Sequence, residues 1–177
     1  IITEKVDAAY DYLSRFSKLL RMVLDNSEKN FISLNSELET IRLYLSLEAL
    51  RFSQSFTYSI ELNEELDKED IFIPSLLLQP FVENAIWHGL INKEGEKKLL
   101  LKFEEREGNL ICIIQDNGIG RERAAEIKKN KLGAGRFESK GTKLALQRIE
   151  IVNRERPGAA DIETIDLFDE AGNASGT

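Results

Sequence analysis

Two apolar stretches joined at a single glycine constrain the fold of this chain more than any other feature. Residues 98–107 and 109–115 both read as strands, and Gly108 between them allows only a tight turn. Strands joined in this way pair antiparallel, because a parallel pair needs a crossover connection of a dozen or more residues. In addition, no G-x-G-x-x-G motif follows a strand. The hairpin therefore argues against a Rossmann-type sheet.

The spacing of apolar residues changes from helical to strand-like at Phe56. Residues 2–24 and 34–52 carry apolar side chains at helical spacing. Residues 56–62 alternate apolar and polar side chains, as a half-buried strand does. Antiparallel strands with helices on one face predict an α+β fold, specifically a two-layer α/β sandwich with an N-terminal helical arm.

The remaining segments give weaker predictions. Residues 71–89 read as a short extended piece and a helix, with Pro74 at the helix entry and Gly89 as its C-terminal cap. The charged, glycine-containing segment 121–140 predicts a surface region with a short helix at most. Two further predictions are a helix over 142–154 and a strand over 161–169, followed by a turn over 171–176.

The N-terminal arm carries one apolar seam. Its members follow a 4-3-4-3 spacing and share one helix face: Ala9, Leu13, Phe16, Leu20 and Val23. Such a seam packs on a helix of the same chain or on a second copy. The 34–52 helix has two apolar faces, so it lies between two partners. Two interpretations of residues 1–52 stay open: a helical hairpin buried on a core, and an arm for dimerisation and signal coupling.

Composition narrows the classes of function. The chain has 24 Lys+Arg against 31 Asp+Glu, a net charge of −7. This acidic balance argues against non-specific binding to nucleic acid or to an anionic membrane. The single Cys112 excludes an internal disulfide and a cysteine zinc site. No apolar run approaches the ~20 residues of a membrane span, so the cytoplasm is the simplest compartment.

Three segments carry residue types suited to a bound nucleotide, and the first contains Asp116. This residue follows an apolar strand, and Gly118 and Gly120 come directly after it. A carboxylate at a strand end can accept a hydrogen bond from an exocyclic amine such as that of adenine. The glycines let the backbone approach a flat ligand closely. Taken alone, these residues are explained more simply by an ordinary Asp-Gly turn.

The second segment runs from Gln79 to Gly89. On an α-helix, Asn84, Trp87 and His88 would project to one side. The amide oxygen of Asn84 is a hard, uncharged ligand that suits Mg²⁺ when phosphates supply the other ligands. The alternative for Asn84 is a buried structural amide.

The third segment is the helix start formed by Lys140, Gly141 and Thr142. A helix start offers free N–H groups and here also a hydroxyl to an anion. Lys140 could neutralise phosphate charge. A plain helix cap with solvated lysines is the alternative.

The order of these segments resembles a known ATP-binding fold. Along the chain, a strand hairpin separates Asn84 from Asp116, and a polar stretch separates Asp116 from Gly141. The Bergerat fold of gyrase, Hsp90, histidine kinases and MutL has the same order. Residues 77–85, with His88 and Gly89, resemble the asparagine box of LytS/YehU-type sensor histidine kinases. Gly141-Thr142 with Arg148-Ile149 resembles a short second glycine box. The N-terminal part is similar to the internal region of that type, so the resemblance covers nearly the whole chain.

The resemblance implies a role for each of these residues. Asn84 would be the Mg²⁺ ligand, with Glu83 beside the metal and His88 near the phosphates. Asp116 would take the adenine amine, and residues 121–140 would form the lid over ATP. The other residues expected at the nucleotide are Gly118 and Gly120 around the adenine and Lys140, Gly141 and Thr142 along the phosphates.

The resemblance also implies an activity. It makes residues 1–52 a helical dimerisation and coupling region downstream of the phosphoacceptor motif. Residues 53–177 become the ATP-binding catalytic domain, cut before its last strand. The expected function is that of a two-component sensor histidine kinase, which passes the γ-phosphoryl of Mg-ATP to a histidine absent here and then to a response regulator. We expect a homodimer formed by the N-terminal helices, in the cytoplasmic part of a membrane-anchored bacterial receptor that meets the membrane only through upstream segments.

Several residues depart from the family pattern. Trp87 stands where a basic residue is common, and Lys143 where a glycine is often found. An Asn-Pro-His-Phe-type acceptor motif does not occur, and the only histidine, His88, is expected in the pocket rather than as the acceptor. A catalytically weak, pseudokinase-like dimeric interaction module is therefore the alternative. An ATP hydrolase of the gyrase or MutL type is disfavoured, because Pro80 stands where its water-activating carboxylate would be.

Overall fold

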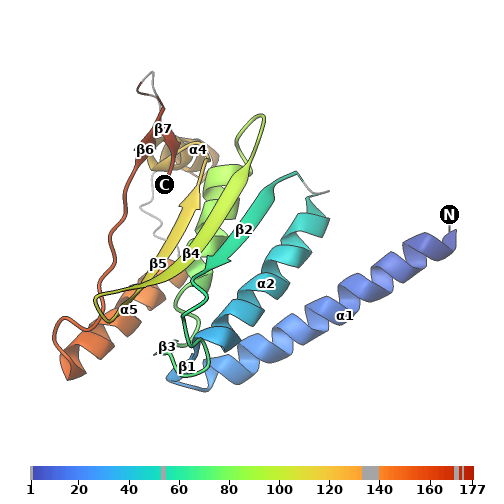
Figure 1. The fold of residues 1–177 in the computed structure, drawn as a ribbon. Helices are drawn as coiled ribbons and strands as arrows, with labels where there is room; N and C mark the ends of the chain where they lie inside the picture. The colour runs from blue at the N-terminus through green and yellow to red at the C-terminus, as the bar shows by residue number, and fades with distance from the viewer. Residues whose placement is uncertain (1, 53–54, 133–139, 170–171, 173) are drawn as a thin grey trace. The chain divides into compact units, whose positions relative to one another are not determined.

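The computed structural model describes residues 2–52, 55–132, 140–169, 172 and 174–177 (Figure 1). The chain divides into two compact units. One comprises Ile1–Ser55 and Asp67–Leu77, and the other comprises Phe56–Leu66 and Leu78–Thr177. Among the described residues, no helix combines the length and the apolar character needed to cross a membrane.

The first unit is built on two long helices, α1 (Ile2–Ser27) and α2 (Leu34–Arg51). Buried Asn26 joins them, because its Nδ2 donates to Thr40 Oγ1 at 3.2 Å and its Oδ1 accepts from Ser36 Oγ at 3.3 Å. Between the helices, β1 (Phe31–Ser33) pairs antiparallel with β3 (Phe72–Pro74).

The predicted seam of α1 lies on the exposed side of that helix. Leu13, Phe16 and Leu20 are 58%, 41% and 48% exposed, whereas Leu19 is buried. Val23, at the end of the seam, is half-buried. The exposed part of the seam, at Leu13, Phe16 and Leu20, is therefore not packed within this unit.

The segment that leads out of the first unit corrects one prediction. Pro74 is the last residue of β3, paired with Phe31, and is not a helix entry. Leu76 follows with a left-handed φ of 52°, and its N–H donates to the fully buried Glu37 Oε2 at 3.1 Å. The helix begins only at Gln79, because the strand pairing holds the chain extended as far as Pro74.

The second unit contains a three-stranded sheet of order β2-β4-β5. Its strands are β2 (Thr57–Leu62), β4 (Lys98–Arg106) and β5 (Asn109–Asp116). Strands β4 and β5 form the predicted antiparallel hairpin, with Gly108 at a left-handed φ of 77°. Strand β2 instead pairs parallel with β4, which the long connection 63–97 allows.

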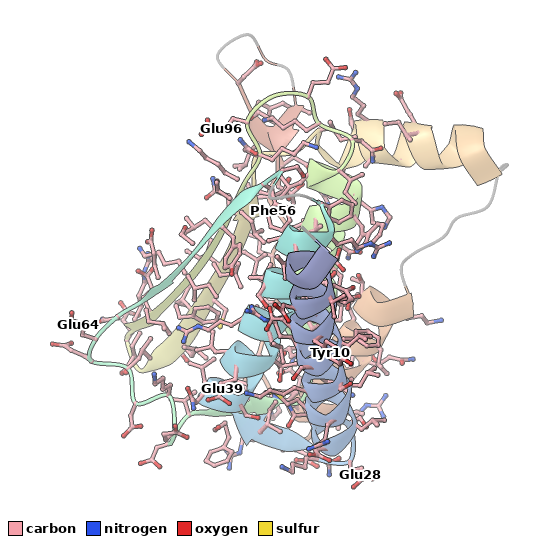
Figure 2. The ribbon with its side chains drawn as sticks, turned by 90° about the vertical axis from the view of Figure 1, so that its right-hand side faces the viewer. Tyr10, Glu28, Glu39, Phe56, Glu64 and Glu96 are labelled. Carbon is pink, nitrogen blue, oxygen red and sulfur yellow. The ribbon has the colours of Figure 1, made fainter. Side chains whose placement is uncertain are left out.

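The helices of this unit lie on one side of the sheet, as Figure 2 shows. They are α3 (Gln79–Asn84), the π-helix η1 (Ala85–Leu90), α4 (Arg121–Leu132) and α5 (Lys140–Glu155). Every second side chain of β4 is buried, because successive side chains of a strand point to opposite faces of the sheet. Apolar residues of these helices are buried as well. The most deeply buried include Leu99, Leu101, Phe103, Val82, Ile86, Leu90 and Ala145. The α+β prediction with N-terminal helices is confirmed.

The end of the second unit also differs from the prediction. Residues 161–166 are not a strand, and only β6 (Leu167–Phe168) is extended there. It pairs antiparallel with β7 (Ala174–Gly176), where the sequence predicts a turn. The backbone O of Thr177 accepts from Asp116 N at 2.9 Å. This bond to the end of β5 holds the 174–177 segment extended.

Candidate functional site

Asp116 is the centre of the first cluster of predicted residues. It is the last residue of β5, and it is only 6% exposed. Its Oδ1 accepts a hydrogen bond from Gly118 N at 2.7 Å. The Asp-Gly turn expected as the simpler alternative is therefore present. It engages one carboxyl oxygen and leaves Oδ2 as the atom that could meet an amine.

Two glycines lie directly against this carboxylate. A Cβ atom on Gly89 or on Gly118 would lie 2.5 Å from Asp116 Oδ1, closer than real Cβ contacts. The backbones of the two glycines also meet, because Ile119 N donates to Gly89 O at 3.2 Å. The prediction that Gly89 caps a helix is wrong, because Gly89 lies inside η1 and the Asp116 carboxylate occupies the space of its missing side chain. The sequence signal for Gly89 was the His88-Gly89 pair, which resembles part of the asparagine box.

Burial changes the acidity of this carboxyl group. Removal from water raises the pKa of Asp116 to about 6, although the Gly118 N–H and the Lys93 ammonium act in the opposite direction. Lys93 also donates to the backbone O of Asn117, which fixes its charge near the site. Sequence reasoning did not identify Lys93. A buried carboxyl group with a raised pKa is typical of functional sites.

Asn84 and Thr142 form a second cluster. Asn84 ends α3, and its Nδ2 donates to Oγ1 of Thr142 in the first turn of α5 at 2.7 Å. A Cβ on Gly141 would lie 3.2 Å from Pro80 Cβ, so the starts of α3 and α5 approach closely. The structure thus brings together the two segments that resemble the asparagine box and the second glycine box.

The donor set at Asn84 fits a magnesium ion that brings its own ligands. Thr142 holds the nitrogen end of the amide, so the oxygen end remains to serve as a ligand. Mg²⁺ takes six oxygen ligands and is usually held by one or two protein groups together with phosphates and water. Among the described residues, no group of three or more His, Cys, Asp or Glu side chains could hold a metal ion.

The neighbours of Asn84 are arranged differently from the prediction. Glu83 Oε1 accepts from Gln79 Nε2 at 2.9 Å, one turn earlier on the same helix. Trp87 and His88 lie in η1, which is a π-helix rather than the α-helix assumed. We expected both side chains to share a face with Asn84 because an α-helix has 3.6 residues per turn. A π-helix has a wider turn, so that spacing no longer places them on one face. His88 is half-buried and Trp87 is 37% exposed.

The remaining predicted residues are placed in part. Gly120 has a left-handed φ of 74°, and a Cβ there would lie 2.6 Å from Ala174 Cβ, so it faces β7 rather than Asp116. The lid segment contains a full helix, α4, in its first part, where only a short helix was expected. Residues 133–139 and the side chain of Lys140 lie outside the described residues.

The two clusters are linked by the chain itself. The six-residue η1 helix starts directly after Asn84 and contains Gly89. Asn84 and Asp116 share no hydrogen bond in the described part of the chain, so η1 is the element that sets their separation. This arrangement can present a carboxylate and an amide oxygen to two parts of one ligand.

Comparison with known proteins shows which families the chain resembles. Residues 1–56 match the family model described as histidine kinase. Over 147 residues the chain is 34% identical to the sensor histidine kinase/phosphatase LytS of Staphylococcus aureus strains Mu50 and N315. The match covers 82% of this chain and 24% of each relative, so the chain spans about a quarter of their length. The chain is therefore similar to the LytS-type sensor histidine kinases over most of its length, and the predicted resemblance is confirmed.

A solved structure also resembles the chain. It is the histidine kinase domain of the blue-light activated histidine kinase EL346 from Erythrobacter litoralis. The superposition has a TM-score of 0.48 and 15% identity, over 78% of this chain and 64% of the other. This likeness is too distant to define the fold by itself.

Proposed function

We propose that this chain is the ATP-binding catalytic region of a two-component sensor histidine kinase. The observation that supports it most is the η1 helix, which begins next to Asn84 and contains the glycine against which Asp116 lies. A nucleotide with its adenine amine at Asp116 would direct its phosphates toward Asn84. The proposal adds a chemical role for these residues to the sequence similarity with LytS.

Each cluster would contribute one part of the reaction. Asp116 would accept a hydrogen bond from the adenine amine and so orient the base. Asn84 would supply one oxygen ligand to Mg²⁺, which when bound neutralises phosphate charge. The helix start at Gly141 and Thr142 would flank the phosphates. Phosphoryl transfer of this kind depends mostly on positioning and charge neutralisation, so these groups need not react covalently.

The phosphoryl acceptor would be a histidine other than His88. His88 lies in η1, which begins directly after Asn84, so it belongs to the proposed nucleotide site itself. From the acceptor histidine the phosphoryl group would pass to an aspartate of a response regulator, as the resemblance implies. We place this activity in the cytoplasmic part of a membrane-attached bacterial receptor.

The exposed seam of α1 supports a homodimer. Leu13, Phe16 and Leu20 present apolar surface at coiled-coil spacing, and the same surface is not packed within its own unit.

Sedimentation equilibrium tests the proposed homodimer: the parent chain should be a dimer, and the double variant Leu13→Glu with Leu20→Glu should be a monomer. Leu144→Glu is the matched control, because Leu144 is 50% exposed on α5 and lies outside the seam. An unchanged dimer in the double variant would contradict the assignment.

Isothermal titration calorimetry separates this function from the alternative. The kinase proposal predicts that ATP binds and that Mg²⁺ strengthens binding. A pseudokinase-like interaction module, suggested by Trp87 and by exposed Lys143, predicts a dimer that binds no ATP. A chain that dimerises through α1 without binding ATP at millimolar concentration would therefore favour the alternative.

A further inference from the structure

The side-chain amide of Asn84 is anchored by a residue far away in the sequence. Its Nδ2 donates to Oγ1 of Thr142 at 2.7 Å, and 58 residues separate the two. Both side chains are half-buried. In this bond the hydroxyl oxygen is the acceptor, and the nitrogen end of the amide faces Thr142.

The surrounding backbone holds this pair together. Pro80, in the first turn of α3, stands one helical turn before Asn84. Gly141 lies so close to Pro80 that a Cβ there would be 3.2 Å from the proline Cβ. Because Gly141 has no side chain, the start of α5 can lie close to the rigid ring of Pro80 in α3. Thr142, the next residue, then reaches Asn84.

A hydrogen-bonded partner can hold an amide side chain in the orientation that a metal ligand needs. The oxygen and nitrogen ends of the amide have nearly the same shape but opposite hydrogen-bonding character. Rotation by 180° would present N–H groups to a cation in place of the oxygen. In the structure the bond to Thr142 holds the nitrogen end and directs the oxygen end away from Thr142. Partners behind metal ligands generally orient the ligand in this way.

We propose that Thr142 is the positioning residue for Asn84, and that its hydroxyl holds the amide nitrogen so that Oδ1 is presented to a divalent cation. The inference rests on the proposed function. It differs from the role expected from the sequence, in which Thr142 lies along the phosphates. Thr142 acts here through Asn84, so its effect should depend on both Mg²⁺ and Asn84.

The test compares Thr142→Val, which keeps the shape but cannot accept a hydrogen bond, with Thr142→Ser, which can. ATP binding is measured by calorimetry in Mg²⁺ and in EDTA. We expect Thr142→Val to weaken Mg-ATP binding about tenfold, in line with other groups that orient metal ligands. Binding in EDTA should stay within about twofold of the parent, and Thr142→Ser should restore the Mg²⁺ effect. Thr164→Val, at an exposed position, is the matched control and should bind like the parent.

A double-mutant cycle with Asn84→Ala distinguishes the two roles of Thr142. If Thr142 acts through Asn84, Thr142→Val causes no further loss in the Asn84→Ala background. Equal losses in both backgrounds, or equal losses in EDTA and Mg²⁺, would show direct contact with the nucleotide and overturn the inference. A Thr142→Val protein that binds Mg-ATP like the parent would overturn it as well. A parent chain that binds no ATP would instead overturn the proposed function, and this inference with it.

Discussion

Asp116→Asn should make the folded protein more stable at neutral pH while strongly weakening its nucleotide binding. The carboxyl group is buried, and its pKa rises from 3.8 to about 6. Because the folded state binds this proton more tightly than the unfolded state, the group favours folding below about pH 4 and loses that contribution as the pH rises through about 6. An asparagine has nearly the same shape, stays neutral at every pH and can still accept from Gly118 N.

The shift sets the size of the effect. A change of one pKa unit corresponds to 1.36 kcal/mol, so ionising Asp116 costs the folded state about 2–3 kcal/mol. We expect the two proteins to have similar unfolding free energies near pH 4. Near pH 7.5 the Asp116→Asn protein should be more stable by about 2–3 kcal/mol.

Urea unfolding followed by circular dichroism, at intervals from about pH 4 to about pH 7.5, measures this difference. Other carboxyl groups, such as Asp166 beside Arg121, have lowered pKa values and act in the opposite direction, but they cancel between parent and variant. A difference that stays constant over this range would refute the account of Asp116 as a buried, destabilising carboxylate. In calorimetry near pH 7.5 the same variant should bind ATP at least about tenfold more weakly, because its amide can turn a donor toward the adenine amine.

Three further predictions test other parts of the site. Gly89→Ala should weaken ATP binding about tenfold, because the new Cβ would lie 2.5 Å from Asp116 Oδ1 and displace it; calorimetry near pH 7.5 that shows parental affinity would contradict this. Asn84→Ala should reduce the effect of Mg²⁺ on ATP affinity more than binding in EDTA, since one of about six ligands is lost, and an unchanged Mg²⁺ titration would remove Asn84 from the site. Incubation with γ-labelled ATP should leave no stable label on the chain, and label that disappears in His88→Gln would make His88 the acceptor.

Local signals in the sequence predicted much of the fold. The β4–β5 hairpin was predictable because apolar runs flank a single Gly108, and its turn depends only on neighbouring residues. Helix α5 agrees with the helix predicted over 142–154. The parallel pairing of β2 with β4 was not predictable, since it depends on the path of the long 63–97 connection. Pro74 was assigned to a helix entry because its pairing with Phe31 is a tertiary contact.

The candidate site divides in the same way. The residue types at Asp116, Asn84 and Thr142 and their order along the chain were visible in the sequence. The contact between Asn84 and Thr142 was not, because it joins residues 58 positions apart. The π-helical turn at 85–90 also escaped prediction, since no local propensity distinguishes it from an α-helix. Gly89 was read as a cap because the carboxylate that occupies its missing side-chain space comes from β5.

Nuclear magnetic resonance of the ¹⁵N-labelled chain, titrated with a non-hydrolysable ATP analogue and Mg²⁺, tests the central claim most directly. The claim is that one nucleotide spans Asp116 and Asn84. We predict saturable shifts of the backbone amides of Gly89 and Gly118 and of the Asn84 side-chain amide. The Asn84 shift should require Mg²⁺, whereas those near Asp116 should persist in EDTA. Saturable shifts confined to residues away from both clusters, or no shifts at millimolar analogue, would contradict the account.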